Sequence, residues 1–227
     1  MRRLASVLLL AVLCASSVCL AAAPICKCTF DKAGWKPDEW TLVKSPRWEH
    51  FGTWVQRADH IENATPPGAT PKDLLRMPLA AQSYTSMVYK TKAKGNVTIK
   101  CTMEFDDRMA PLVVIAPELG KSAKGQPEYR EHFEICVFDK GVNVWHHVFK
   151  DGKPSWKKAA FATFALKPKT RYTLEVKKKN TKRGKELTVT IDGHTFGYLD
   201  DSLPEEFYVG ITGCEGVNRF YDFQIGK

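Results

Sequence analysis

Apolar residues recur at every second position in many short segments of this chain, and this alternation restricts its fold more than any other feature. Ile99, Cys101 and Met103, for example, alternate with polar residues. Successive side chains of a strand point to opposite faces, so a period of two predicts strands with one buried face. The same pattern returns in segments 133–137, 142–148, 172–176 and 187–191.

Turn-forming sequences such as Lys140–Gly141 and Asp192–Gly193 separate these segments. The one helical signal is short and lies at 70–75, where a capping threonine precedes a proline and an acidic residue. Many short strands with turns roughly every 8 to 12 residues predict an all-β antiparallel sandwich or barrel. The missing crossover helices exclude a parallel α/β fold.

The N-terminus has the pattern of a secretory signal peptide, which we expect to span residues 1–23. Arg2 and Arg3 precede a short apolar run, and three alanines at 21–23 offer small residues for cleavage. We therefore expect a secreted, periplasmic or cell-surface protein. Residues 24–50 are predicted to form an irregular lead-in, and residues 51–227 the folded domain. No later apolar stretch is long enough to span a membrane.

Cys14 and Cys19 leave with the signal peptide, and five of the seven cysteines remain. In an oxidising compartment they predict up to two disulfides and one odd thiol. Cys26 and Cys28 are too close in sequence to pair with each other. We expect one of them to pair with Cys214 and to tie the two chain ends together, although other pairings stay open. A zinc site is the competing interpretation, and no second Cys or His cluster at ligand spacing supports it. The remaining cysteines are Cys26, Cys28, Cys101, Cys136 and Cys214.

The net charge of +9 does not indicate a polyanionic partner. Two of the basic residues belong to the signal peptide, and a group of six lies at one expected hairpin turn without an acid among them. Basicity confined to one solvated turn is typical of edge protection and solubility. We therefore expect no nucleic-acid partner. The group is Lys177, Lys178, Lys179, Lys182, Arg183 and Lys185.

The C-terminal third contains a characteristic succession of strands. A strand ends in Ile191-Asp192-Gly193, the next contains Val209-Gly210-Ile211, and the last contains Tyr221-Asp222-Phe223. This succession resembles the concanavalin A-like lectin/glucanase superfamily, in particular its laminin G-like and 3-keto-disaccharide hydrolase branches. The resemblance implies a two-sheet jelly roll over residues 51–227, whose outer, concave face often holds a saccharide. A resemblance of this kind specifies a fold better than an activity.

Two of the expected strands place polar and aromatic side chains on one outer face. The turn at Lys140–Gly141 predicts a hairpin, so the outward sets of both strands adjoin. An aromatic ring among hydrogen-bonding groups is what a sugar site requires. The alternative is that Trp145 and Phe149 pack under a loop, with the histidines as solvated neighbours. The expected binding set is His132, Glu134, Asn143, Trp145 and His147.

The segment 117–130 is a long connection that leads into the first of these two strands. Connections of this length in compact domains are often functional. We expect it to form a wall of the groove, with Tyr129 and Arg130 as further substrate contacts.

Evidence for catalysis is weak in the sequence. Glycoside hydrolysis normally uses two carboxyl groups about 5 Å apart, or roughly 6.5 to 9.5 Å apart in inverting enzymes. The acidic cluster of the glycosidases that share this fold is absent, and Glu131 and Glu134 lie on opposite faces of a strand. The candidates are Glu134 as an acid or base, and His132 or His147 as the base of a lyase. The motifs of the jelly-roll alginate lyases are not found.

Some members of the superfamily bind a structural Ca²⁺ through a C-terminal aspartate, and the resemblance places Asp222 at the matching position. Oxygen ligands suit Ca²⁺, but a single carboxylate can equally cap a neighbouring strand. A structural calcium is therefore one expectation, and no other cofactor is predicted.

The sequence supports three hypotheses. The first is a secreted domain that binds an oligo- or polysaccharide on the face bearing Trp145. The second is a glycan-active enzyme, a hydrolase or a lyase, that uses the same face. The third is a non-catalytic cell-surface interaction module. Because the expected groove has no special positive character, a bound glycan is predicted to be neutral or mildly acidic.

Overall fold

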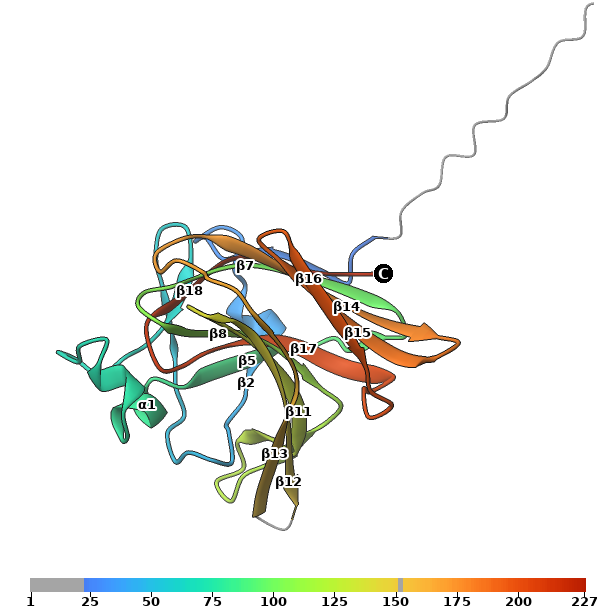
Figure 1. Cartoon of the computed structure of the whole chain (residues 1–227). Coiled ribbons are helices and arrows are strands. Elements are labelled where there is room, and N and C mark those ends of the chain that lie inside the picture. Colours follow the sequence, from blue (N-terminus) through green and yellow to red (C-terminus); the bar gives the residue numbers. More distant parts are fainter. Residues whose placement is uncertain (1–22, 151–152) are drawn as a thin grey trace, which may run out of the picture.

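The computed structural model describes residues 23–150 and 153–227. The expected signal peptide at 1–23 lies outside the described residues, except for its last position. The described chain is an all-β sandwich of two large antiparallel sheets (Figure 1). The predicted two-sheet antiparallel jelly roll is thus confirmed.

The first sheet has eight strands. Their order is β16-β15-β14-β7-β18-β4-β3, and β1 pairs with β18 outside this path. The strands are β1 (Cys26–Thr29), β3 (Trp54–Gln56), β4 (Ile61–Asn63), β7 (Val97–Phe105), β14 (Tyr172–Thr181), β15 (Gly184–Ile191), β16 (His194–Leu199) and β18 (Asn218–Gly226).

The second sheet also has eight strands and carries the candidate site. Their order is β13-β12-β11-β8-β17-β5-β2, and β6 pairs with β17 outside this path. The strands are β2 (Trp40–Leu42), β5 (Thr85–Tyr89), β6 (Ala93–Lys94), β8 (Met109–Ala116), β11 (Glu131–Phe138), β12 (Gly141–Lys150), β13 (Lys153–Thr163) and β17 (Glu206–Gly213).

The core lies between the two sheets and follows from the alternation in the sequence. In β7, residues 97, 99, 101, 103 and 105 are buried, whereas the residues between them are at least partly exposed. In β11, Phe133, Ile135 and Val137 are buried in the same core cluster. Each strand therefore contributes one apolar face, and burying these faces between two sheets provides the main favourable contribution to folding.

Helices are few and short. The signal at 70–75 corresponds to a 3-10 helix at Asp73–Leu75. It is followed by α1 (Leu79–Gln82), which is the one α-helix in the described part of the chain. A second 3-10 helix occupies Pro37–Glu39. In the described residues no helix is long and apolar enough to cross a membrane.

The lead-in at 24–50 is more regular than expected. Its strand β1 pairs with β18 of the first sheet, and its strand β2 pairs with β5 of the second. Trp40 packs its ring edge-on against Phe223, with centroids 5.3 Å apart. The lead-in therefore adds an edge strand to the second sheet and closes one side of the core.

The expected disulfide is absent, because all five cysteines of the described chain are free. Cys26 and Cys28 point from β1 into the core between the sheets. Cys214 instead packs with Cys136 in a separate cluster on the second sheet. Burial raises the pKa of Cys26 and of Cys28 to about 12, which keeps both thiols protonated.

Candidate functional site

The register of the β11–β12 hairpin brings the predicted outward residues together. His132 lies opposite His147, Glu134 opposite Trp145, and Cys136 opposite Asn143. Directly opposed residues of an antiparallel pair have their Cβ atoms about 4.5 to 5.5 Å apart, so these side chains share one face. The predicted common face is therefore present.

His146 has the opposite orientation to its neighbour His147. Its ring stacks on Phe133 of the core at a centroid distance of 4.1 Å, and its Nε2 lies 2.7 Å from Glu131 Oε1. The alternation along β12 places its side chain on the core side, where it contacts Phe133.

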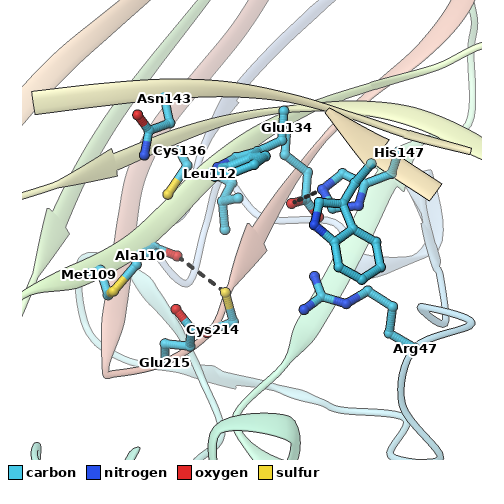
Figure 2. Close-up of a pocket in the computed structure, with 12 residues that line it drawn as sticks. Arg47, Met109, Ala110, Leu112, Glu134, Cys136, Asn143, His147, Cys214 and Glu215 are labelled. Atoms are coloured by element: carbon cyan, nitrogen blue, oxygen red, sulfur yellow. Dashed lines mark hydrogen bonds and ion pairs between the residues drawn. The ribbon is translucent and has the colours of Figure 1, made fainter. Parts of the chain in front are cut away.

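A pocket of about 230 Å³ opens on this outer face (Figure 2). It is lined by two tryptophans, several hydrogen-bonding side chains and the apolar residues Met109, Ala110 and Leu112 of β8. Strands β11, β12 and β13 supply most of the polar and aromatic groups, while Arg47 and Glu215 come from loops. The principal side chains are Arg47, Glu134, Asn143, Trp145, His147, Trp156 and Glu215.

Trp156 is the most exposed aromatic side chain of the pocket. It lies on β13 opposite His147 and is 54% exposed. The Arg47 guanidinium lies 5.7 Å from its ring centroid and 4.6 Å from that of Trp48. Trp145 is half-buried, and the Lys158 ammonium lies 5.9 Å from its ring.

Three of the principal pocket side chains, Trp156, Arg47 and Glu215, were not predicted from the sequence. Trp156 could have been found by extending the predicted hairpin with a third antiparallel strand, in which Trp156 lies opposite His147. Arg47 and Glu215 come from loops far apart in the chain, and no local pattern points to them. Only the tertiary fold brings these two residues to the same pocket.

His132, Glu134 and His147 form a buried polar cluster at one side of the pocket. His132 Nε2 lies 3.0 Å from Glu134 Oε1, and His147 Nε2 lies 3.1 Å from Oε2. The two imidazole rings are stacked, with centroids 4.9 Å apart and an interplanar angle of 8°. The first contact is a hydrogen bond, whereas the second is close but poorly aligned for one.

Burial and the contacts within this cluster shift the pKa values of Glu134 and His132. Burial alone would raise the pKa of Glu134, but the two histidines outweigh burial and hold its pKa well below the usual range. Burial lowers the pKa of His132, and Glu134 offsets only part of that effect. Across the pocket, burial raises the pKa of Glu215. The two pocket carboxyl groups therefore lie in environments of opposite character.

Tyr129 and Arg130, the expected contacts from the long connection, do not line this pocket. The connection forms a small hairpin of β9 (Leu119–Lys121) and β10 (Pro127–Tyr129), which covers part of the outer face. Tyr129 is fully buried there, shares a 2.7 Å hydrogen bond with Ser86 and stacks on His132. Arg130 pairs with Glu128 at 3.1 Å and lines a different depression.

Asp222 lies on the first sheet, away from the pocket. It is exposed on β18, opposite Thr29 and Thr102. Lys27 and Lys100 line the same shallow depression. One carboxylate beside two lysines is a poor set for Ca²⁺, which prefers six to eight oxygen ligands. A calcium role for Asp222 stays a prediction.

The layers and the strand order define a jelly-roll protein with the concanavalin A-like fold. No family model matches the sequence, and no curated protein matches it either. Solved structures of similar fold are only 8 to 13% identical to this chain, so the likeness concerns the fold.

Three such structures illustrate it. A carbohydrate-binding module from Bacillus subtilis has a TM-score of 0.56 and 11% identity, covering 83% of this chain and 96% of that one. Peanut lectin, in complex with a peptide, has a TM-score of 0.55 and 11% identity, covering 88% and 96%. The kappa-carrageenase of Pseudoalteromonas carrageenovora, in complex with a kappa-carrageenan oligosaccharide, has a TM-score of 0.54 and 9% identity, covering 88% and 92%.

Proposed function

We propose that this protein binds an oligo- or polysaccharide in the pocket on the outer face of its second sheet. One observation carries the proposal, namely that Trp145 and Trp156 line a pocket together with several hydrogen-bonding side chains. Sugar rings have apolar C–H faces that stack on aromatic rings, and their hydroxyl groups need polar partners. The pocket offers both.

The polar groups are arranged around the aromatic ones. Asn143 provides a donor and an acceptor, and Arg47 provides donors beside the Trp156 ring. Glu134 and Glu215 add two carboxyl groups to the single guanidinium. This balance gives no excess of positive charge, so a neutral saccharide fits the pocket better than a highly anionic one.

The fold and the N-terminus give further support. Proteins of similar fold include a carbohydrate-binding module and a lectin, which makes saccharide binding a reasonable expectation for this chain. The signal-peptide pattern in residues 1–23 supports secretion, where extracellular glycans are accessible.

The proposal can be tested by screening the purified protein on a glycan array and measuring its hits by calorimetry. A hit whose affinity falls in Trp145→Ala would support binding at this pocket. An affinity unchanged by this substitution would place the binding site elsewhere. A protein that binds no glycan would instead support the interaction-module hypothesis.

A second candidate function is glycoside hydrolysis, and a specific observation favours it. Glu134 and Glu215 line the same pocket in environments that move their pKa values apart. Glycosidases pair an ionised carboxylate with a carboxylic acid of raised pKa in this way. Glu215 would act as the general acid and Glu134 as the base or nucleophile.

Hydrolysis can be measured by incubating the array hits with the protein and detecting new reducing ends. Glu215→Gln should remove product formation and retain binding, because the amide cannot deliver a proton. Glu62→Gln, on the outer face of the first sheet, is the matched control and should form product at the wild-type rate. Product formation unchanged by Glu215→Gln would refute this assignment.

A further inference from the structure

His132, Glu134 and His147 have the composition and spacing of a metal site. One ligand atom from each lies within 4.8 Å of the other two, and all three side chains are buried. They come from the adjacent strands β11 and β12 of the second sheet, and each of these strands is hydrogen-bonded to a neighbour on both sides. We infer that these three side chains bind a divalent transition-metal ion such as Zn²⁺.

The donor set indicates which class of ion the cluster suits. Two imidazole nitrogens and one carboxylate oxygen match the three protein ligands of open zinc sites, and also those of the two-histidine, one-carboxylate iron sites. Ca²⁺ and Mg²⁺ prefer oxygen ligands throughout. The cluster should therefore select a first-row transition ion over either of them.

The hydrogen bonding of His147 is the second observation. This side chain is buried, yet neither of its ring nitrogens has a hydrogen-bond partner among the described residues. Buried polar atoms without partners are rare in folded proteins and call for an explanation. A metal ion bound to Nε2 would provide a partner for the nitrogen that faces Glu134.

Metal binding requires a small rearrangement of the rings. The two imidazoles are nearly parallel, so their lone pairs cannot both point to one ion. His132 is held by its hydrogen bond to Glu134 and by stacking on Tyr129. His147 lacks such a hydrogen bond, so rotation of its ring about the Cβ–Cγ bond can complete the site.

The cluster also lacks a nearby positive partner for its carboxylate. Among the described residues, no ion pair joins Glu134 to lysine or arginine, and its charged contacts are the two histidines. Arg47 lines the same pocket but stacks on Trp48 and Trp156. A divalent cation would supply the missing charge, as buried carboxylates are normally paired or coordinated to metal.

Access to the ion would come from the pocket. Glu134 and His147 line it (Figure 2). His132 is not among its lining residues and stacks on Tyr129. The open coordination positions would therefore face the pocket. Coordination would also remove Glu134 from any acid-base role, so Zn²⁺ should inhibit hydrolysis if the second candidate function is correct.

Calorimetric titration of chelator-treated wild-type protein with Zn²⁺ tests the inference. We expect one ion per chain, and affinity at least about 100-fold weaker in both His147→Ala and Glu134→Ala. His194→Ala is the matched control, because this exposed histidine stacks on Phe164 of the β13–β14 connection and should leave Zn²⁺ affinity unchanged. An equal affinity in His147→Ala and wild type would overturn the inference.

A second measurement uses only wild-type protein, in case a variant fails to fold. With ¹⁵N-labelled histidine, Zn²⁺ should shift the ring-nitrogen resonances of His132 and His147 and leave those of His194 in place. Excess Ca²⁺ should not reverse the shifts. Unchanged resonances of the two cluster histidines, or reversal by Ca²⁺, would refute the site. Both measurements exclude glycans, so their failure would leave the saccharide proposal standing.

Discussion

Trp156→Ala is the sharpest test of the saccharide pocket, because the side chain is exposed and contributes little to the fold. Trp156 is 54% exposed, and its ring centroid lies 5.7 Å from the Arg47 guanidinium and 6.4 Å from that of the His147 ring. An exposed cation–π contact contributes about 0.5 to 1 kcal/mol. For a chain of this size, the loss should lower Tm by about 4 °C or less.

The expected effect on binding is much larger. Truncating an aromatic residue at the centre of a binding site typically costs about 2 kcal/mol or more. This corresponds to an increase in Kd of roughly 30-fold. Calorimetry with the best glycan from the array measures the change in Kd, and differential scanning calorimetry measures the change in Tm.

Phe161→Ala provides the matched control. Phe161 lies on the same strand, opposite Asn143, and is 60% exposed, but it does not line the pocket. We expect a similar small change in Tm and no change in Kd. If both variants lost affinity equally, or if Trp156→Ala kept the wild-type Kd, the placement of the sugar on this tryptophan would be wrong.

Three further predictions follow from the buried groups. Tyr129→Phe removes the hydroxyl group that hydrogen-bonds with Ser86, so the free energy of unfolding measured with urea should fall by about 1 to 3 kcal/mol. The Kd for the glycan should stay constant, and an altered Kd would show that Tyr129 contacts the saccharide. Burial lowers the pKa of His132 below 6.5, so the unfolded chain takes up a proton that the folded chain does not. The free energy of unfolding should therefore fall as pH drops below about 6.5. In His132→Gln the free energy of unfolding should change less steeply with pH, and equal slopes in the variant and the wild type would contradict the lowered pKa. Finally, alkylation of the unfolded protein without reductant should label all five described cysteines, and a cross-linked peptide of Cys26 or Cys28 with Cys214 would contradict the free thiols.

The alternation of apolar residues was sufficient to predict an all-β antiparallel sandwich or barrel, and the resemblance of the C-terminal third selected the two-sheet jelly roll. In β7 and β11 the predicted inward residues are those buried between the sheets, because a strand can bury only every second side chain against a core. The same rule placed His132, Glu134, Asn143, Trp145 and His147 on one face, since the turn at Lys140–Gly141 set the register of the hairpin.

The predictions that the structure does not bear out concern contacts between distant parts of the chain. The disulfide with Cys214 was expected because the cysteines lie near the two chain ends. The structure places Cys26 and Cys28 in the core and Cys214 in a separate cluster on the second sheet. Tyr129 was expected at the pocket, but the β9–β10 hairpin covers the sheet there and buries it.

The sequence by itself determined the fold class, the inward and outward faces of the predicted strands, and the composition of the β11–β12 hairpin. These properties depend on local periodicity and on one short turn. The tertiary structure alone decided that Arg47 and Glu215 join Trp156 around the pocket, and that Glu134 is buried between two histidines. Loop positions and burial depend on the packing of the whole chain, which no single segment encodes.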